Sequence, residues 1–221
     1  MDNERVGNDC PLCSGVQVRP FAEVRSRKFF RCEVCRLTYL DPQQRLGPLE
    51  EWKRYRTHRN DPYDEGYRKF LNRLARPLLM CLGKGAKGLD YGCGPGPTLS
   101  VMFQEKGFAM DIYDPFFAPF HNVFSKSYDF ITCSETAEHF FCPGAEFRRL
   151  ARMLRPGGRL GVMTEMQEDD DAFVHWHYIR DPTHVSFYHI HTMEWIAREH
   201  GWNMERPEKN VVLFQKNSIK A

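Results

Sequence analysis

The chain has 221 residues, of which 42% are hydrophobic and 14% aromatic, and it carries a formal net charge of +2. This length is sufficient for one domain with a full hydrophobic core and a small appendage. No segment approaches the ~18 consecutive apolar residues of a membrane span, and the polar first ten residues contain no signal-peptide core. We therefore expect a cytoplasmic protein that does not enter membranes.

Residues 1–45 contain two C-x2-C pairs that flank a strand-like stretch. This spacing is typical of a four-thiolate zinc ribbon. A segment this short has too little core to fold alone, and a structural Zn²⁺ would supply the missing stability. The alternative is a coincidence of four reduced cysteines. Without secretion we expect no disulfides. The predicted zinc ligands are Cys10, Cys13, Cys32 and Cys35.

Residues 46–83 are predicted to form a helical connector, with Asp64 as the cap of a helix. The apolar residues of that helix would face the core: Tyr67, Phe70, Leu71, Leu74 and Leu78. An upstream polar and aromatic cluster suits either a lid over a ligand or an exposed linker. It comprises Tyr55, His58, Asn60 and Tyr63.

Residues 84–221 alternate between strand and helix patterns. Strands are expected to end at Asp90 and Asp114 and to cover 128–134, 159–165 and 210–216. Helices are expected from near Pro97, over 144–158, a stretch that includes the stop signal of its helix, and over 192–202. This alternation predicts an α/β fold, a Rossmann-like doubly wound and mostly parallel sheet, with the small zinc ribbon in front of it.

The first predicted strand runs into the glycine-rich turn "LDYGCGPG", which opens a helix. Gly92, Gly94 and Gly96 would let the backbone approach a ligand closely. Asp114, at the end of the next strand, is placed to bind ribose hydroxyls. A dinucleotide dehydrogenase is the competing interpretation, but its fingerprint is G-x-G-x-x-G, whereas this turn reads G-x-G-x-G.

These motifs resemble those of class I S-adenosylmethionine-dependent methyltransferases over residues 84–221, and "LRPGGRL" resembles a helix-to-strand junction of that fold. The cysteine pairs, the linker and the turn together resemble bacterial zinc-ribbon methyltransferases, some of which act on sugars and other small molecules. The resemblance implies an enzyme that uses S-adenosylmethionine. The implied cofactor-binding residues are Asp90, Gly92, Gly94, Gly96, Asp114 and Ser134.

One departure from that family lies between Asp114 and the strand at 128–134. The intervening segment is too short for the usual helix and third strand, which must be shortened or absent. The acidic residue that often contacts the adenine amino group has no clear match there. Phe116 and Phe117 would contact the adenine instead, or would be ordinary core residues.

The stretch "SETAEHF" places Glu135, Glu138 and His139 at spacings that share one face of a helix. This E-x2-E-H pattern resembles metal-dependent O-methyltransferases of ubiquinone synthesis and of small-RNA 3′ ends. The resemblance implies a fourth ligand, His184 in "DPTHVSFY". The loop before it, 165–182, is long and acidic, contains Trp176 and suits a substrate lid. A divalent ion there would activate an acceptor hydroxyl, and nitrogen ligands favour Mn, Fe, Co or Zn over Mg.

A metal-free site with the same residues stays open. In it Glu135 would hydrogen-bond the loop, His139 would fill a partly buried polar position, and His184 would act as a general base. Glu135, Glu138, His139 and His184 are the predicted catalytic residues in either case.

The predicted function is methyl transfer from S-adenosylmethionine to a hydroxyl of a small-molecule acceptor, with or without a second divalent metal. One alternative is an RNA methyltransferase that binds RNA through the basic and aromatic residues of "VRSRKFFRC". Another is a zinc-ribbon binding protein that has lost catalysis. The sequence favours a small-molecule partner over RNA and predicts no oligomeric state.

Overall fold

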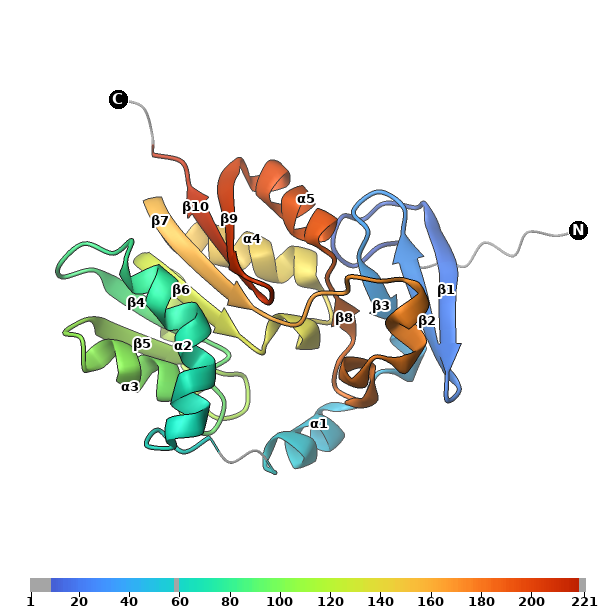
Figure 1. Ribbon diagram of the computed structural model, residues 1–221, viewed down its shortest axis with the longest axis horizontal. Helices are drawn as coiled ribbons and strands as arrows, with labels where there is room; N and C mark the ends of the chain where they lie inside the picture. The colour runs from blue at the N-terminus through green and yellow to red at the C-terminus, as the bar shows by residue number, and fades with distance from the viewer. Residues whose placement is uncertain (1–8, 58–59, 219–221) are drawn as a thin grey trace, which may run out of the picture.

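The computed structural model describes residues 9–57 and 60–218, which form two β-sheets packed together (Figure 1). The larger sheet has six strands in the order β5-β4-β6-β7-β10-β9. Strands β5, β4, β6 and β7 are parallel neighbours, and β10 and β9 follow antiparallel. The strands are β4 (Lys87–Tyr91), β5 (Ala109–Tyr113), β6 (Tyr128–Ser134), β7 (Leu154–Met163), β9 (Trp202–Glu208) and β10 (Val211–Lys216).

Helices cover both faces of this sheet. One face packs against α2 (Glu65–Leu79) and α3 (Thr98–Gln104), the other against α4 (Pro143–Met153) and α5 (Ile190–His200). The predicted doubly wound, mostly parallel α/β fold is therefore confirmed. No helix among the described residues is long and apolar enough to cross a membrane.

Helix α2 forms as its sequence pattern predicts. The Asp64 side chain accepts a hydrogen bond from the Tyr67 N–H at 2.6 Å and so caps the helix. Leu74 and Leu78 are fully buried, and a Cβ on Gly161 of β7 would lie 2.7 Å from Leu74 Cδ1. The missing side chain at Gly161 thus lets α2 pack closely on the sheet.

Strand β5 lies at the edge of the larger sheet, where the third strand of a complete fold would extend it. Residues 115–127 contain instead an isolated bridge between Asp114 and Ala118 and a short 3₁₀ turn, His121–Ser125. This turn packs Phe124 against Tyr113 with 4.7 Å between the ring centroids. The predicted loss of the helix and third strand is confirmed.

The smaller sheet is the ribbon sheet, with the strand order β1-β2-β3-β8 and antiparallel pairing throughout. Its first three strands come from the N-terminal segment, whereas β8 comes from far along the chain (Figure 1). The helix α1 (Pro48–Tyr55) then leads toward α2. The strands are β1 (Val18–Val24), β2 (Arg27–Cys32), β3 (Thr38–Leu40) and β8 (Ser186–Phe187).

The structure corrects two expectations about local elements. The helix predicted over 144–158 ends at Met153, and β7 starts at Leu154, because Pro156 lacks the N–H that a helix needs. The loop 165–182 is no lid over the cavity described below. Its Trp176 packs against Phe173 and Phe187, on the ribbon sheet. Strand β9 was not predicted.

Candidate active site

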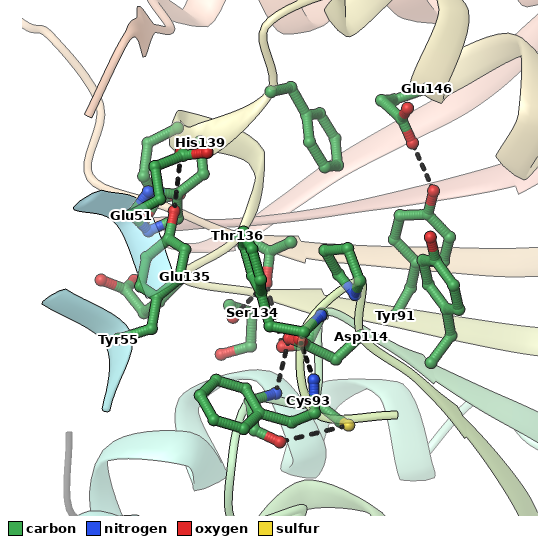
Figure 2. Close-up of a pocket in the computed structure, with 18 of the residues that line it drawn as sticks. Glu51, Tyr55, Tyr91, Cys93, Asp114, Ser134, Glu135, Thr136, His139 and Glu146 are labelled. Carbon is green, nitrogen blue, oxygen red and sulfur yellow. Dashed lines mark hydrogen bonds between the residues drawn. The ribbon is translucent and has the colours of Figure 1, made fainter. Parts of the chain in front are cut away.

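A cavity of about 660 Å³ opens at the carboxyl ends of β4, β5 and β6 (Figure 2). Open α/β sheets bind ligands at this edge, because the loops that leave parallel strands meet there. In Figure 2 Asp114 lies near the centre, with Tyr91 and Glu146 toward one end and His139, Glu51 and Tyr55 toward the other. The cavity therefore has two distinguishable ends.

The glycine turn forms the floor near the centre. Gly92 and Gly94 line the cavity, and Gly94 has a φ of +63°, which glycine adopts without the steric cost of a Cβ. Gly96 does not line it. A Cβ on Gly96 would lie 1.7 Å from the Asn60 carbonyl oxygen, so this glycine is needed for chain packing. Of the three predicted glycines, two face the cavity.

Asp114 lines the cavity and is 8% exposed. One of its carboxylate oxygens accepts the N–H groups of Phe116 and Phe117, at 2.8 and 3.0 Å, and the other accepts that of Gly94 at 3.1 Å. These bonds hold the carboxylate at the glycine turn with lone pairs still available to a ligand. Phe116 and Phe117 line the cavity beside it.

Asp90 lies beneath the turn and does not line the cavity. It is 4% exposed and accepts a hydrogen bond from Thr132 Oγ1 at 2.8 Å. Burial raises the pKa of Asp90 to about 6, against the lowering effect of the Thr132 hydrogen bond. Asp90 was predicted to bind the cofactor, but its side chain does not reach the cavity. Its hydrogen bond with Thr132 instead connects β4 to β6.

The end of the cavity where Glu146 lies is lined by aromatic and polar side chains. Tyr91 donates a hydrogen bond to Glu146, and Arg149 donates to the Tyr91 hydroxyl at 2.9 Å and to Glu146 at 2.7 Å. Tyr113 packs beside Tyr91 with 5.0 Å between the ring centroids. The sequence pattern gave no sign of this group, because its members come from β4, β5 and α4.

The opposite end gathers Glu138, His139 and His184, whose potential ligand atoms all lie within 4.8 Å of one another. We call these three residues the transfer cluster. His139 Nδ1 lies 3.0 Å from the Thr183 carbonyl and His184 Nδ1 lies 2.7 Å from the Tyr178 carbonyl. Because a carbonyl only accepts, each Nδ1 carries the proton and each Nε2 keeps a lone pair.

Burial and hydrogen bonds fix the charge state of His184 and the orientation of the Glu138 carboxylate. Burial lowers the pKa of His184, against the opposing effect of Glu138. Glu138 is fully buried and accepts hydrogen bonds from the Tyr178 hydroxyl and, at 2.8 Å, from Thr164 Oγ1. Two imidazoles whose Nδ1 atoms face carbonyls, beside a fixed carboxylate, match a site for a divalent transition metal.

Glu135 does not share a helical face with Glu138 and His139, and that expectation is wrong. The residue has a left-handed φ of 47°, and the helical part of the turn is a 3₁₀ segment, Ala137–His139. The Tyr178 hydroxyl lies 3.4 Å from Glu135 Oε2, whereas Oε1 is buried without a partner among the described residues. Burial and then Glu138 raise the pKa of Glu135 well above its ordinary value.

Ser134 also lines the cavity, and its Oγ is buried without a partner among the described residues. Glu135 and Ser134 thus present two unpaired polar oxygens between the glycine turn and the transfer cluster. A buried polar atom without a partner is destabilising, so both atoms are suited to a bound ligand.

Helix α1 adds residues to this end that the sequence did not single out for chemistry. Glu51 lines the cavity at 8% exposure, and burial raises its pKa, against the lowering effect of His139. The Tyr55 ring meets the His139 ring edge-on at 5.2 Å. Of the predicted lid cluster, Tyr55 and Asn60 line the cavity, Tyr63 is 79% exposed, and His58 lies outside the described residues.

The four ribbon cysteines form a second cluster, separate from the cavity, with their sulfurs within 4.8 Å of one another. The Cys10–Cys35 and Cys13–Cys32 sulfur pairs are each 3.5 Å apart. Tetrahedral zinc with bonds of about 2.3 Å would set sulfurs about 3.8 Å apart, so the arrangement fits the ion. The first cysteine pair, Cys10 and Cys13, lies against α4, where the Gly144 N–H donates to the Pro11 carbonyl at 3.1 Å.

Comparisons with known proteins agree with this geometry. A family model described as a methyltransferase domain matches residues 55–206. A search of curated proteins found no match. Among solved structures, the PH0226 protein of Pyrococcus horikoshii is 16% identical with a TM-score of 0.50, covering 76% of this chain and 99% of its own.

A second similar structure is the 1,6-didemethyltoxoflavin-N1-methyltransferase of Burkholderia thailandensis, which was solved with S-adenosylhomocysteine bound. It is 15% identical with a TM-score of 0.47, covering 90% of this chain and 100% of its own.

Proposed function

We propose a specific reaction for this chain, which belongs to the methyltransferase domain family: transfer of the methyl group of S-adenosylmethionine to a hydroxyl of a small-molecule acceptor. The predicted class, an S-adenosylmethionine-dependent methyltransferase, is confirmed by that membership. The acceptor, the metal and the roles of individual residues below are our proposal.

The centre of the cavity suits the cofactor. Asp114 would accept hydrogen bonds from the ribose hydroxyls, and Gly92 and Gly94 leave room for the chain of atoms beside it. Tyr113 and Tyr91 line the same cavity and would hold the base, and Ser134, with its unpaired Oγ, would hold the methionine part. S-adenosylmethionine, when bound, supplies an electrophilic methyl group on its sulfur.

The acceptor would bind at the transfer cluster. Glu138 and the Nε2 atoms of His139 and His184 would hold a divalent ion such as Mn²⁺, Fe²⁺, Co²⁺ or Zn²⁺, in keeping with their nitrogen and carboxylate donors. Such an ion would supply Lewis-acid polarisation of the acceptor oxygen. The carbonyls of Thr183 and Tyr178 hold the two imidazoles in the tautomer that this role requires.

Glu135 would take up the acceptor proton at Oε1, its unpaired oxygen. A general base is most effective when its pKa lies near the working pH, and burial moves the pKa of Glu135 upward from the ordinary range. We therefore assign Glu135 a proton-accepting role in place of the predicted metal-ligand role.

A small molecule fits the structure better than RNA does. The residues of "VRSRKFFRC" that would contact RNA are mostly engaged within the protein. Arg31 is fully buried and pairs with Asp170 at 2.9 Å, and Phe29 and Phe30 are buried in the cores. The cavity of about 660 Å³ is the size of a pocket for a cofactor with a small acceptor.

The observation that carries the proposal is the convergence of Glu138, His139 and His184 in the same cavity as the glycine turn. A chelator that leaves zinc in the ribbon should abolish methyl transfer while S-adenosylhomocysteine still binds, and added Mn²⁺ or Co²⁺ should restore transfer. Mass spectrometry of a cell extract treated with isotopically labelled S-adenosylmethionine identifies the acceptor and the methylated atom.

Full activity after complete chelation would end the metal role and leave Glu135 and His184 as the two candidates for the general base. A label found on nitrogen or carbon would end the assignment to a hydroxyl.

A further inference from the structure

We infer that the ribbon sheet is part of the transfer site, because Arg27 of β2 and the strand β3 position His184 and the turn that carries Glu138 and His139. The inference rests on the proposed function, since it takes the transfer cluster as the place of methyl transfer. It assigns Arg27 as a positioning residue, although Arg27 does not line the cavity.

Arg27 holds the loop that ends in His184. Its Nη1 donates to the Ile179 carbonyl at 2.6 Å and its Nη2 donates to the His184 carbonyl at 2.9 Å. Nη1 also lies 3.4 Å from the Asp181 carbonyl. The planar guanidinium thus joins both ends of a short loop with fixed geometry, which the single ammonium of a lysine cannot reproduce.

The next residues pair with the ribbon sheet. The Leu40 N–H donates to the Val185 carbonyl at 2.9 Å. Next to this bond β3 pairs antiparallel with β8, and Tyr39 lies opposite Ser186. The backbone that follows His184 is therefore one strand of the ribbon sheet. Its position depends on the place of β3.

The same segment is bonded on its other side to the turn that carries Glu138 and His139. The Val185 N–H donates to the Glu138 carbonyl at 2.9 Å, and Ser186 Oγ donates to the Phe140 carbonyl at 2.8 Å. The buried Tyr188 hydroxyl donates to the Ala137 carbonyl at 2.9 Å. Residues 185–188 thus form a strap between the edge of the ribbon sheet and the transfer cluster.

The contacts of Arg27 fix the position of the His184 loop and contribute little to the hydrophobic core. Among the described residues the Arg27 guanidinium donates hydrogen bonds to main-chain carbonyls of the His184 loop and lies over the Phe29 ring, outside the cavity and the cysteine cluster. A reacting centre tolerates errors of only about 0.5 Å, so a loosened loop weakens it without unfolding the protein. The remaining hydrogen bonds of the strap would keep β8 in the sheet.

The test compares three variants of the full chain with zinc retained in the ribbon. Arg27→Met keeps the aliphatic stem and removes the donors, and Arg27→Lys restores one donor group. Lys28→Met, the next residue of β2, is exposed and serves as the matched control. For each protein the affinities for Mn²⁺ and for S-adenosylhomocysteine are measured by titration. The hydrogen-exchange rates of its backbone amides are measured peptide by peptide.

We expect Arg27→Met to lower Mn²⁺ affinity about 10- to 100-fold, the range for lost outer-shell contacts to metal ligands. Amides in 178–188 should exchange faster, whereas S-adenosylhomocysteine affinity and exchange in the glycine turn should stay at wild-type values. Arg27→Lys should fall between, and Lys28→Met should match the wild type.

Wild-type Mn²⁺ affinity and unchanged exchange of 178–188 in Arg27→Met would overturn the inference. If the wild-type protein binds no Mn²⁺, the proposed metal role fails instead. The exchange of 178–188 then decides alone whether Arg27 positions this segment.

Discussion

The two ends of the cavity are built in different ways. The cofactor end comes mostly from one continuous stretch, in which β4, the glycine turn, α3 and β5 follow one another and Asp114 bonds back to Gly94, and α4 adds Glu146 and Arg149. The transfer end joins α1, the turn after β6 and the loop before β8, and the ribbon sheet holds that loop. Damage to the ribbon should therefore affect the transfer end more strongly than the cofactor end, which the ribbon reaches through the contact of Pro11 with α4.

The variant Cys32→Ser tests that separation most severely, and we expect its effect to be the largest. Loss of one thiolate should release the predicted zinc, and the ribbon should then unfold because zinc binding supplies much of its folding free energy. Methyl transfer should be lost, while calorimetry should find S-adenosylhomocysteine affinity within a few-fold of the wild type. Metal analysis checks the zinc. A variant that keeps full zinc and activity would contradict the ribbon's role at the transfer end.

If Cys32→Ser lost cofactor binding and methyl transfer equally, the two ends of the cavity would not differ in their dependence on the ribbon. The exposed Cys81→Ser variant is the matched control, because it removes a thiol away from both clusters.

The variant Glu138→Gln acts only at the transfer end. It removes a buried charge between His139 and His184 while keeping the side-chain shape, so turnover should fall about 100-fold or more, in line with the loss of a preorganised charged group. Stability should change by only about 1–3 kcal/mol, from the altered hydrogen bonds with Tyr178 and Thr164. Steady-state kinetics and thermal unfolding measure the two effects.

A drop in cofactor affinity that equals the drop in turnover would show that Glu138 serves both ends. Glu208→Gln offers a control carboxylate that is exposed on β9, outside the transfer cluster.

The variant Asp114→Ala acts only at the cofactor end and should have the smallest effect of the three. We expect S-adenosylmethionine binding to weaken by about 2–3 kcal/mol, because hydrogen bonds to a charged carboxylate are lost. Asp114→Asn keeps an acceptor for the Phe116 and Phe117 N–H groups and separates loop ordering from ribose binding. Calorimetry decides, and unchanged affinity in both variants would move the ribose contact elsewhere.

The same difference explains what the sequence could predict. The glycine turn and Asp114 lie close together along the chain, and the cysteine spacing encodes its own cluster, so both patterns are readable locally. The pairing of β3 with β8 joins residues far apart in the chain, and no local pattern in Ser186 or Phe187 indicates it. The role of Arg27 depends on that pairing.

Glu135 shows a second limit. Its spacing from Glu138 and His139 fits a helix, but the turn begins with a left-handed residue and tightens into a 3₁₀ segment. The conformation comes from tertiary contacts, such as the Glu135 N–H bond to the Met163 carbonyl at 2.7 Å. A spacing rule cannot anticipate such a bond.

The late arrival of β8 also affects the biosynthesis of the protein. On the ribosome β3 emerges long before Ser186 and Phe187, and at 5–20 residues per second it waits roughly 7 to 30 seconds for its partner. During that time the ribbon presents an open strand edge, which is a template for aberrant pairing between nascent chains. The transfer cluster closes only when β8 docks, so a ribosome-bound chain acquires its cofactor turn before it acquires the site that would use the methyl group.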